Sequence, residues 1–119
     1  MKDNIIKSKS FQFAIRIVNL YKYLVESKKE FVLSKQLLRS GTSIGANIRE
    51  GVNGESTADF IHKFAIAQKE CEETIYWLDL LNATNFLSEK EYSSINAEAI
   101  EIMKLLTSII KSAKKNINN

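Results

Sequence analysis

The sequence predicts an all-α protein, an antiparallel four-helix bundle with up-down-up-down topology. Two features of the composition favour helices: proline is absent, and only 4 of the 119 residues are glycine, so the turn residues that an all-β fold needs are scarce. The third feature is the recurrence of apolar residues every three or four positions along four segments. The length and the apolar share of 45% suit one domain, which we expect to span residues 1–119.

The first helix is predicted over residues 8–27. Its apolar side chains lie at helical spacing and are expected to face the core. They are Phe11, Ile15, Val18, Tyr21, Leu24 and Val25. A short polar break over residues 27–30 separates this helix from the next one.

The second helix is predicted over residues 33–51, and three kinds of side chain divide its surface. The apolar seam consists of Leu33, Leu37, Gly41, Ile44 and Ile48. A polar seam lies roughly 100° around the helix axis and contains Ser40, Ser43, Asn47 and Glu50. Gly41 and Gly45 predict close helix packing, because the glycine spacing matches neither common phosphate-binding loop.

The third helix is predicted over residues 56–82, after a turn at residues 51–54 whose glycines suit a positive φ. Ser56 and Asp59 have the spacing of a capping box. The main apolar seam consists of Phe60, Phe64, Ala67, Cys71, Ile75, Leu78 and Leu81. A second apolar patch, formed by Ile66, Trp77 and Leu80, is interpreted as a subunit interface, with burial inside the bundle as the alternative.

The fourth helix is predicted over residues 89–112, with Ser88 and Glu91 as its capping box. Its apolar face consists of Tyr92, Ile95, Ala99, Ile102, Leu106 and Ile109. Residues 113–119 form a basic tail that we expect to fray. The short connections between the four helices favour antiparallel neighbours.

The charge is unevenly distributed along the chain. Residues 1–54 hold ten Lys and Arg against four Asp and Glu, whereas residues 55–87 hold two against six. The basic first half predicts an electropositive surface for a polyanion. The candidate nucleic-acid surface consists of Lys22, Lys28, Lys29, Lys35, Arg39 and Arg49. Phosphate contacts of this kind would carry little sequence selectivity.

The sequence offers no constellation for catalysis. His62 and Cys71 are the one histidine and the one cysteine, too few for a zinc site or a histidine-ligated di-iron site, so we expect no catalytic residue, metal or cofactor. The acidic cluster of Glu70, Glu72 and Glu73 is interpreted as a solvated face that pairs with a neighbouring subunit. Neither a signal-peptide pattern nor a run of ~18 apolar residues is present, which predicts a cytoplasmic protein without a membrane partner.

The run from Leu38 to Gly51, LRSGTSIGANIREG, resembles the signature of the four-helix-bundle family encoded by bacterial 23S rRNA intervening sequences. The segments 60–67 and 70–81 are also similar to that family. The resemblance implies a cytoplasmic bacterial bundle, commonly a ring-like homopentamer, without established enzymatic activity. It singles out the polar seam of the second helix. A related branch comprises the accessory proteins of diversity-generating retroelements.

The resemblance leads to two hypotheses of function. In the first, the protein is a non-enzymatic homo-oligomer that associates with RNA or with a reverse transcriptase through its basic surface. In the second, it is a protein-interaction scaffold with no nucleic-acid role. Salt-dependent affinity for RNA would distinguish them.

Overall fold

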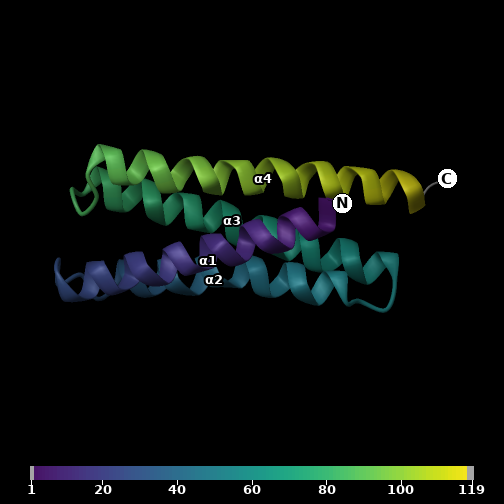
Figure 1. Ribbon diagram of the computed structural model, residues 1–119, viewed down its shortest axis with the longest axis horizontal. Helices are drawn as coiled ribbons and strands as arrows, with labels where there is room; N and C mark the ends of the chain where they lie inside the picture. Colours follow the sequence, from purple (N-terminus) through teal and green to yellow (C-terminus); the bar gives the residue numbers. More distant parts are fainter. Residues whose placement is uncertain (1, 118–119) are drawn as a thin grey trace.

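Four helices pack side by side as an elongated bundle in the computed structural model, which describes residues 2–117 and the side chains of residues 5–117 (Figure 1). The helices are α1 (Lys2–Glu26), α2 (Leu33–Val52), α3 (Thr57–Ala83) and α4 (Glu89–Ile117). The chain reverses direction at each turn, and α1 also packs against α4, which closes the bundle. The bundle measures 51 × 22 × 20 Å. The predicted all-α four-helix fold is confirmed.

The first and the last helix are longer than predicted. α1 begins at Lys2 instead of residue 8, because Ile6 is buried and extends the apolar seam toward the N-terminus. α4 continues to Ile117 instead of ending at residue 112, and Lys114 and Lys115 in its last turn suit the negative end of the helix dipole. The basic tail predicted from residue 113 is thus helical through residue 117, its expected fraying stays a prediction, and residues 118–119 lie outside the described part.

The face of α1 that enters the core differs from the prediction. Of the predicted residues, Leu24 is fully buried and Val18, Tyr21 and Val25 are half-buried. Phe11 and Ile15 were also expected inside, but their side chains are exposed, whereas Phe13 and Ile17 are buried. α1 carries two apolar stripes with similar spacing, and contact with α2 selects between them. A Cβ atom at Gly41 would lie 2.7 Å from the side chain of Ile17, so α1 approaches α2 closely through this residue pair.

The predicted apolar seams of α2, α3 and α4 do form the core. Their fully or nearly fully buried members are Leu37, Ile44, Ile48, Phe64, Ala67, Cys71, Leu78, Leu81, Ile95, Ala99, Ile102, Leu106 and Ile109. Leu33, Phe60, Ile75 and Tyr92 pack half-buried at its edge. Within residues 2–117, no helix has both the length and the apolarity needed to cross a membrane.

The glycines at the α2–α3 connection have a role other than the predicted one. None of the four glycines adopts a positive φ. Within residues 2–117, the residues with positive φ are Lys29 and Asn85, in the two other connections. Gly51 still belongs to α2 and is buried. A Cβ atom there would lie 2.8 Å from the Phe64 ring, so Gly51 allows α3 to pack closely against the end of α2.

Side-chain caps mark the beginnings of three helices. Ser88 and Glu91 form the predicted capping box at α4, in which each residue's side chain accepts the backbone N–H of the other. At α3, the Ser56 hydroxyl accepts the N–H of Asp59. The cap of α2 was not predicted: the buried Glu30 carboxylate accepts the N–H groups of the helix's first turn.

Candidate nucleic-acid interface

The six basic residues of the candidate nucleic-acid surface are all exposed, but they occupy three different places. Lys22 lies in the last turns of α1, and Lys28 and Lys29 lie in the α1–α2 connection. Lys28 sits 5.9 Å from the centre of the Tyr23 ring. The remaining three, on α2, point in different directions and are described below.

Arg39 points toward α3 and is electrostatically compensated. Its Nη2 atom lies 2.6 Å from Oε1 of Glu73, and its Nη1 atom lies 3.6 Å from Oε2 of Glu70. The indole N–H of Trp77 donates to the same Glu73 oxygen at 3.3 Å. Two members of the acidic cluster thus pair with Arg39 within the chain, and this arrangement contributes little to a phosphate-binding surface.

Arg49 points toward α1 and lies 5.6 Å from the centre of the Phe11 ring. Lys35, on α2, has no ion-pair partner among residues 5–117. The predicted surface is therefore divided into four parts. Lys22, Lys28 and Lys29 form a basic end at the α1–α2 connection. Lys35 is isolated, Arg39 is paired with carboxylates, and Arg49 lines the groove described below.

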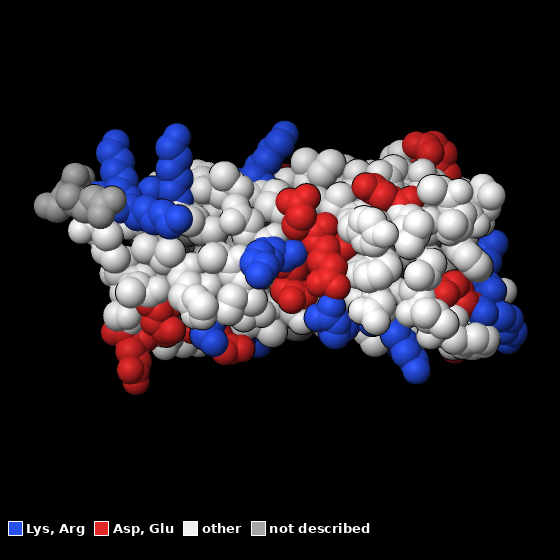
Figure 2. Space-filling view, turned by 180° about the vertical axis from the view of Figure 1, so that it is seen from behind, with Lys and Arg blue, Asp and Glu red and all other residues white. Residues whose placement is uncertain are grey.

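A basic stripe on α4 was not predicted. Lys104, Lys111, Lys114 and Lys115 are exposed, and the helical spacing places them on one side of α4. None of them has an ion-pair partner among the described side chains. Figure 2 shows basic side chains projecting along this edge, whereas acidic side chains gather near the middle of the same view. Lys104 and Lys111 lie within the predicted helix, and the continuation of α4 to Ile117 adds Lys114 and Lys115 to the same side.

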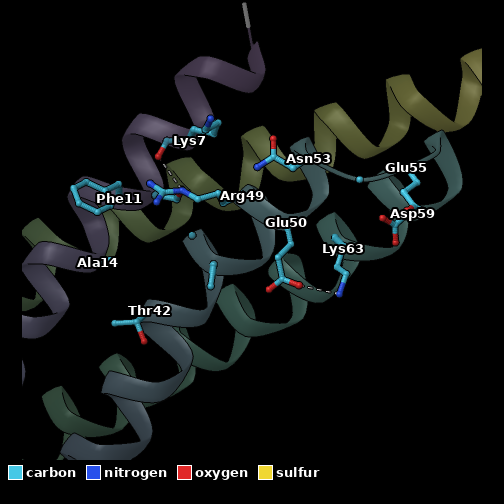
Figure 3. Close-up of a pocket in the computed structure, with 14 residues that line it drawn as sticks. Lys7, Phe11, Ala14, Thr42, Arg49, Glu50, Asn53, Glu55, Asp59 and Lys63 are labelled. Atoms are coloured by element: carbon cyan, nitrogen blue, oxygen red, sulfur yellow. Dashed lines mark hydrogen bonds and ion pairs between the residues drawn. The ribbon is translucent and has the colours of Figure 1, made fainter.

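A groove of about 790 Å³ lies between the N-terminal half of α1, the C-terminal half of α2 and the start of α3 (Figure 3). Its two ends differ in character. Lys7, Phe11 and Arg49 lie together at one end, and Glu55 and Asp59 lie at the other. The groove brings together residues that are distant in the sequence, so the sequence pattern contained no signal for it.

The polar seam of α2 borders α3. The Ser40 and Thr74 hydroxyl oxygens lie 3.0 Å apart, and Lys63 of α3 forms an ion pair of 3.1 Å with Glu50. The other two residues bond within α2. The Ser43 hydroxyl donates to the Arg39 carbonyl, and the Asn47 amide donates to the Ser43 carbonyl. These contacts give the seam a helix-packing role.

The candidate oligomer interface lies on the outward side of α3. Ile66, Trp77 and Leu80 are half-buried, and Trp77 packs against the core. The neighbouring Tyr76, which was not predicted as part of this interface, is 58% exposed. Its ring meets Trp77 edge to face, with the ring centres 5.0 Å apart. Tyr76 is thus the most accessible large side chain of this surface.

The single histidine and the single cysteine differ in burial. His62 is exposed on α3, and Cys71 is buried, where desolvation and the nearby Glu72 carboxylate raise the pKa of its thiol to about 12. Among the described residues, no group of three or more His, Cys, Asp and Glu side chains is placed to hold a metal ion.

Comparison with known proteins assigns the fold and the motif to one family. The family model described as 23S rRNA-intervening sequence protein matches residues 2–108. A crystal structure of a protein with unknown function from the S23 ribosomal protein family, from Bacteroides thetaiotaomicron, is similar with a TM-score of 0.92 and 62% sequence identity. The match covers 93% of this chain and 99% of that one. No curated protein matches the chain. The chain belongs to the family of 23S rRNA-intervening sequence proteins.

Proposed function

We propose that this protein is a non-enzymatic, homo-oligomeric bundle that acts in the cytoplasm by binding the phosphate backbone of RNA. The observation that carries this proposal is the division of its cations into paired and unpaired groups. The ion pairs among residues 5–117 use Lys9, Arg16, Arg39 and Lys63. The unpaired exposed lysines include Lys22, Lys28, Lys29 and Lys35, together with the basic stripe of α4.

Unpaired lysines favour a polyanion as the partner. An exposed cation without an ion-pair partner can contact a phosphate directly, and the counterions released from the nucleic acid drive the association. A cation that is already paired with a carboxylate loses that partner when it binds phosphate, so its net contribution is smaller. The basic end at the α1–α2 connection and the stripe of α4 are therefore the surfaces on which we expect RNA.

The test compares two variants that lose the same charge. Lys28→Gln/Lys29→Gln removes two unpaired cations, and Lys9→Gln/Arg39→Gln removes two paired ones. RNA binding is measured by fluorescence anisotropy between ~50 and ~200 mM salt, where phosphate contacts are strongly salt-dependent. We expect the first variant to bind more weakly and to lower the salt slope by about two, and the second to change both much less. Equal losses would refute the proposed surface.

Self-association is the second part of the proposal, with a pentamer as the assembly that the family resemblance implies. It is supported by the apolar side chains on the outward face of α3, namely Ile66, Trp77, Leu80 and the exposed Tyr76. Tyr76→Glu leaves the core contact of Trp77 in place, so it tests the surface more cleanly than Trp77→Asp. Light scattering should give an oligomeric mass for the wild type and a smaller one for Tyr76→Glu; a monomeric wild type would exclude this part.

The alternative is a protein-interaction scaffold without a nucleic-acid role. It is favoured by exposed apolar residues outside α3, above all Phe31 and Val32, which are 54% and 70% exposed at the α1–α2 connection. The two functions give opposite results in the same titration. A scaffold shows negligible RNA affinity even at ~50 mM salt, where phosphate-driven binding is strongest. A reverse transcriptase would be one protein partner to test in that case.

A further inference from the structure

We propose that the groove between α1 and α2 binds one nucleotide of a single-stranded RNA, with the base stacked on Phe11 and a phosphate held by Lys7 and Arg49. The inference rests on the proposed function, because RNA is the polyanion in both. It adds a base-binding site to a surface that otherwise contacts only phosphate.

The aromatic part of the site is Phe11. Its side chain is 52% exposed, and its ring lies beside the Arg49 guanidinium, 5.6 Å from ring centre to Cζ. Exposed aromatic rings and guanidinium planes are the surfaces on which proteins stack unpaired bases. An exposed phenylalanine next to an arginine inside a groove therefore fits a base better than a phosphate alone.

The phosphate part of the site is the cationic end of the groove. Lys7 projects from α1 and Arg49 projects from α2, both near Phe11 at this end of the groove (Figure 3). Neither forms an ion pair with a described residue, whereas the third cation of the groove, Lys63, is paired with Glu50. Among the side chains of residues 5–117, the groove's cations without a carboxylate partner thus lie at the end that holds the aromatic ring.

The opposite end of the groove is acidic. Glu55 and Asp59 line this end, and Asn53 lies between the two ends (Figure 3). These carboxylates repel a phosphate, so the phosphate is expected at the cationic end beside Phe11. The groove volume of about 790 Å³ is within the usual range of small-ligand sites.

The occupant is a single strand because stacking on Phe11 requires an unstacked base. Bases inside an RNA duplex are covered by their neighbours, and side chains cannot enter its narrow major groove. The basic end and the α4 stripe have no such requirement, since they contact the backbone. The structure thus separates a strand-selective contact in the groove from unselective contacts elsewhere on the bundle.

The experiment measures the affinity of the full chain for a labelled RNA of about ten nucleotides, as a single strand and as a duplex of the same sequence. Phe11→Leu removes the ring but keeps an apolar side chain, and Phe11→Tyr restores a ring. The control is Ile15→Ala, which removes an exposed apolar side chain of α1 outside the groove. We expect Phe11→Leu to weaken single-strand binding about tenfold and to leave duplex binding unchanged. Phe11→Tyr and Ile15→Ala should bind like the wild type.

The salt dependence separates stacking from charge. Arg49→Gln should lower the slope of log K against log salt by about one, whereas Phe11→Leu should leave the slope unchanged. Circular dichroism checks that each variant retains its helices. Unchanged single-strand affinity of Phe11→Leu, or equal losses on single strand and duplex, would overturn the inference while leaving the proposed function intact.

Two further outcomes distinguish the remaining possibilities. If neither RNA binds at ~50 mM salt, the inference and the proposed function both fail. Guanosine monophosphate, added as a competitor of the labelled single strand, distinguishes a strand from a free nucleotide as the occupant of the groove. If it displaces the strand only in large excess, the occupant is a strand. If it displaces the strand as effectively as unlabelled strand does, the occupant is a free nucleotide and the inference is overturned.

Discussion

The hydroxyl oxygens of Ser40 on α2 and Thr74 on α3 lie 3.0 Å apart, and both residues are completely buried. The Thr74 oxygen is also 2.7 Å from the Glu70 carbonyl, and the Ser40 oxygen is 3.4 Å from the Leu37 carbonyl. Each hydroxyl has one hydrogen, so one hydroxyl donates to the other, and the remaining hydrogen is donated to a carbonyl. Ser40 is a residue of the family motif, and this contact gives it a structural role between two helices.

We expect Ser40→Ala to lower the free energy of unfolding by about 1 kcal/mol, because a buried hydrogen bond is lost and Thr74 loses a partner. Urea titration measures the change. The double variant Ser40→Ala/Thr74→Val should be less destabilised than the sum of the single variants, since both remove the same contact. Ser43→Ala is the control, because its hydroxyl donates within α2. A fully additive double variant would contradict the coupling.

The Glu30 cap predicts a pH-dependent contribution to stability. Burial raises the pKa of Glu30, but hydrogen bonds from the Leu33, Ser34 and Val32 N–H groups outweigh it, so the pKa lies below its ordinary value of 4.5. A lowered pKa in the folded state stabilises the protein above the unfolded pKa, and this stabilisation is lost as the pH falls through the folded value. The contribution of Glu30 is therefore complete at neutral pH and disappears in acid.

We expect Glu30→Gln to lose about 1 kcal/mol at pH 7, as the loss of a helix cap does. Unfolding at several pH values should show the difference from the wild type shrinking below pH 4.5. Glu26→Gln, at an exposed position near the end of α1, is the matched control and should have little effect. A difference that stays constant down to pH 2 would exclude the carboxylate as its source.

Gly41 and Gly45 should respond differently to the same substitution. A Cβ atom at Gly41 would lie within 2.7–3.0 Å of three Ile17 atoms, whereas at Gly45 its nearest neighbours are Ser10 oxygens at 3.4 Å. We expect Gly41→Ala to lower the unfolding free energy by about 1–3 kcal/mol through overpacking. Gly45→Ala should be neutral or stabilising, because alanine favours a helix. Equal effects in thermal unfolding would contradict the close α1–α2 approach at Ile17.

Cys71 should be inert in the folded protein. Its pKa of about 12 leaves on the order of a thousandfold less thiolate at pH 8 than a free cysteine has. We expect a thiol-specific chromogenic disulfide reagent to label Cys71 only as fast as the protein opens, and to label it fully in urea. Rapid labelling of the native protein at pH 8 would show that the thiol is accessible.

Much of the fold could be predicted because the spacing of apolar residues along a helix is visible in the sequence. Apolar spacing identified all four helices and the buried faces of α2, α3 and α4, and the spacing of Ser88 and Glu91 identified the cap of α4. These features depend on residues within about two turns of one another, so local sequence contains them. The α2 cap by Glu30 is equally local, but its glutamate lies outside the usual cap residues.

The candidate site depended on which helices meet. The basic side chains could be listed from the sequence, but not the pairing of Arg39 with Glu73, which leaves that arginine compensated. The contact between Phe11 and Arg49 could likewise not be predicted, because Phe11 was expected in the core. A sequence pattern along one helix gives the angle of each side chain around the helix axis. It does not show which residue of another helix that side chain contacts.

The sequence by itself determined the helical class, the family motif and three of the four buried faces, because these follow from spacing within single helices. Only the tertiary structure decided which of the two apolar stripes of α1 is buried. Both stripes have helical spacing, and the close contact of Ile17 with Gly41 selects one of them. That selection leaves Phe11 exposed beside Arg49, and the groove exists because of it.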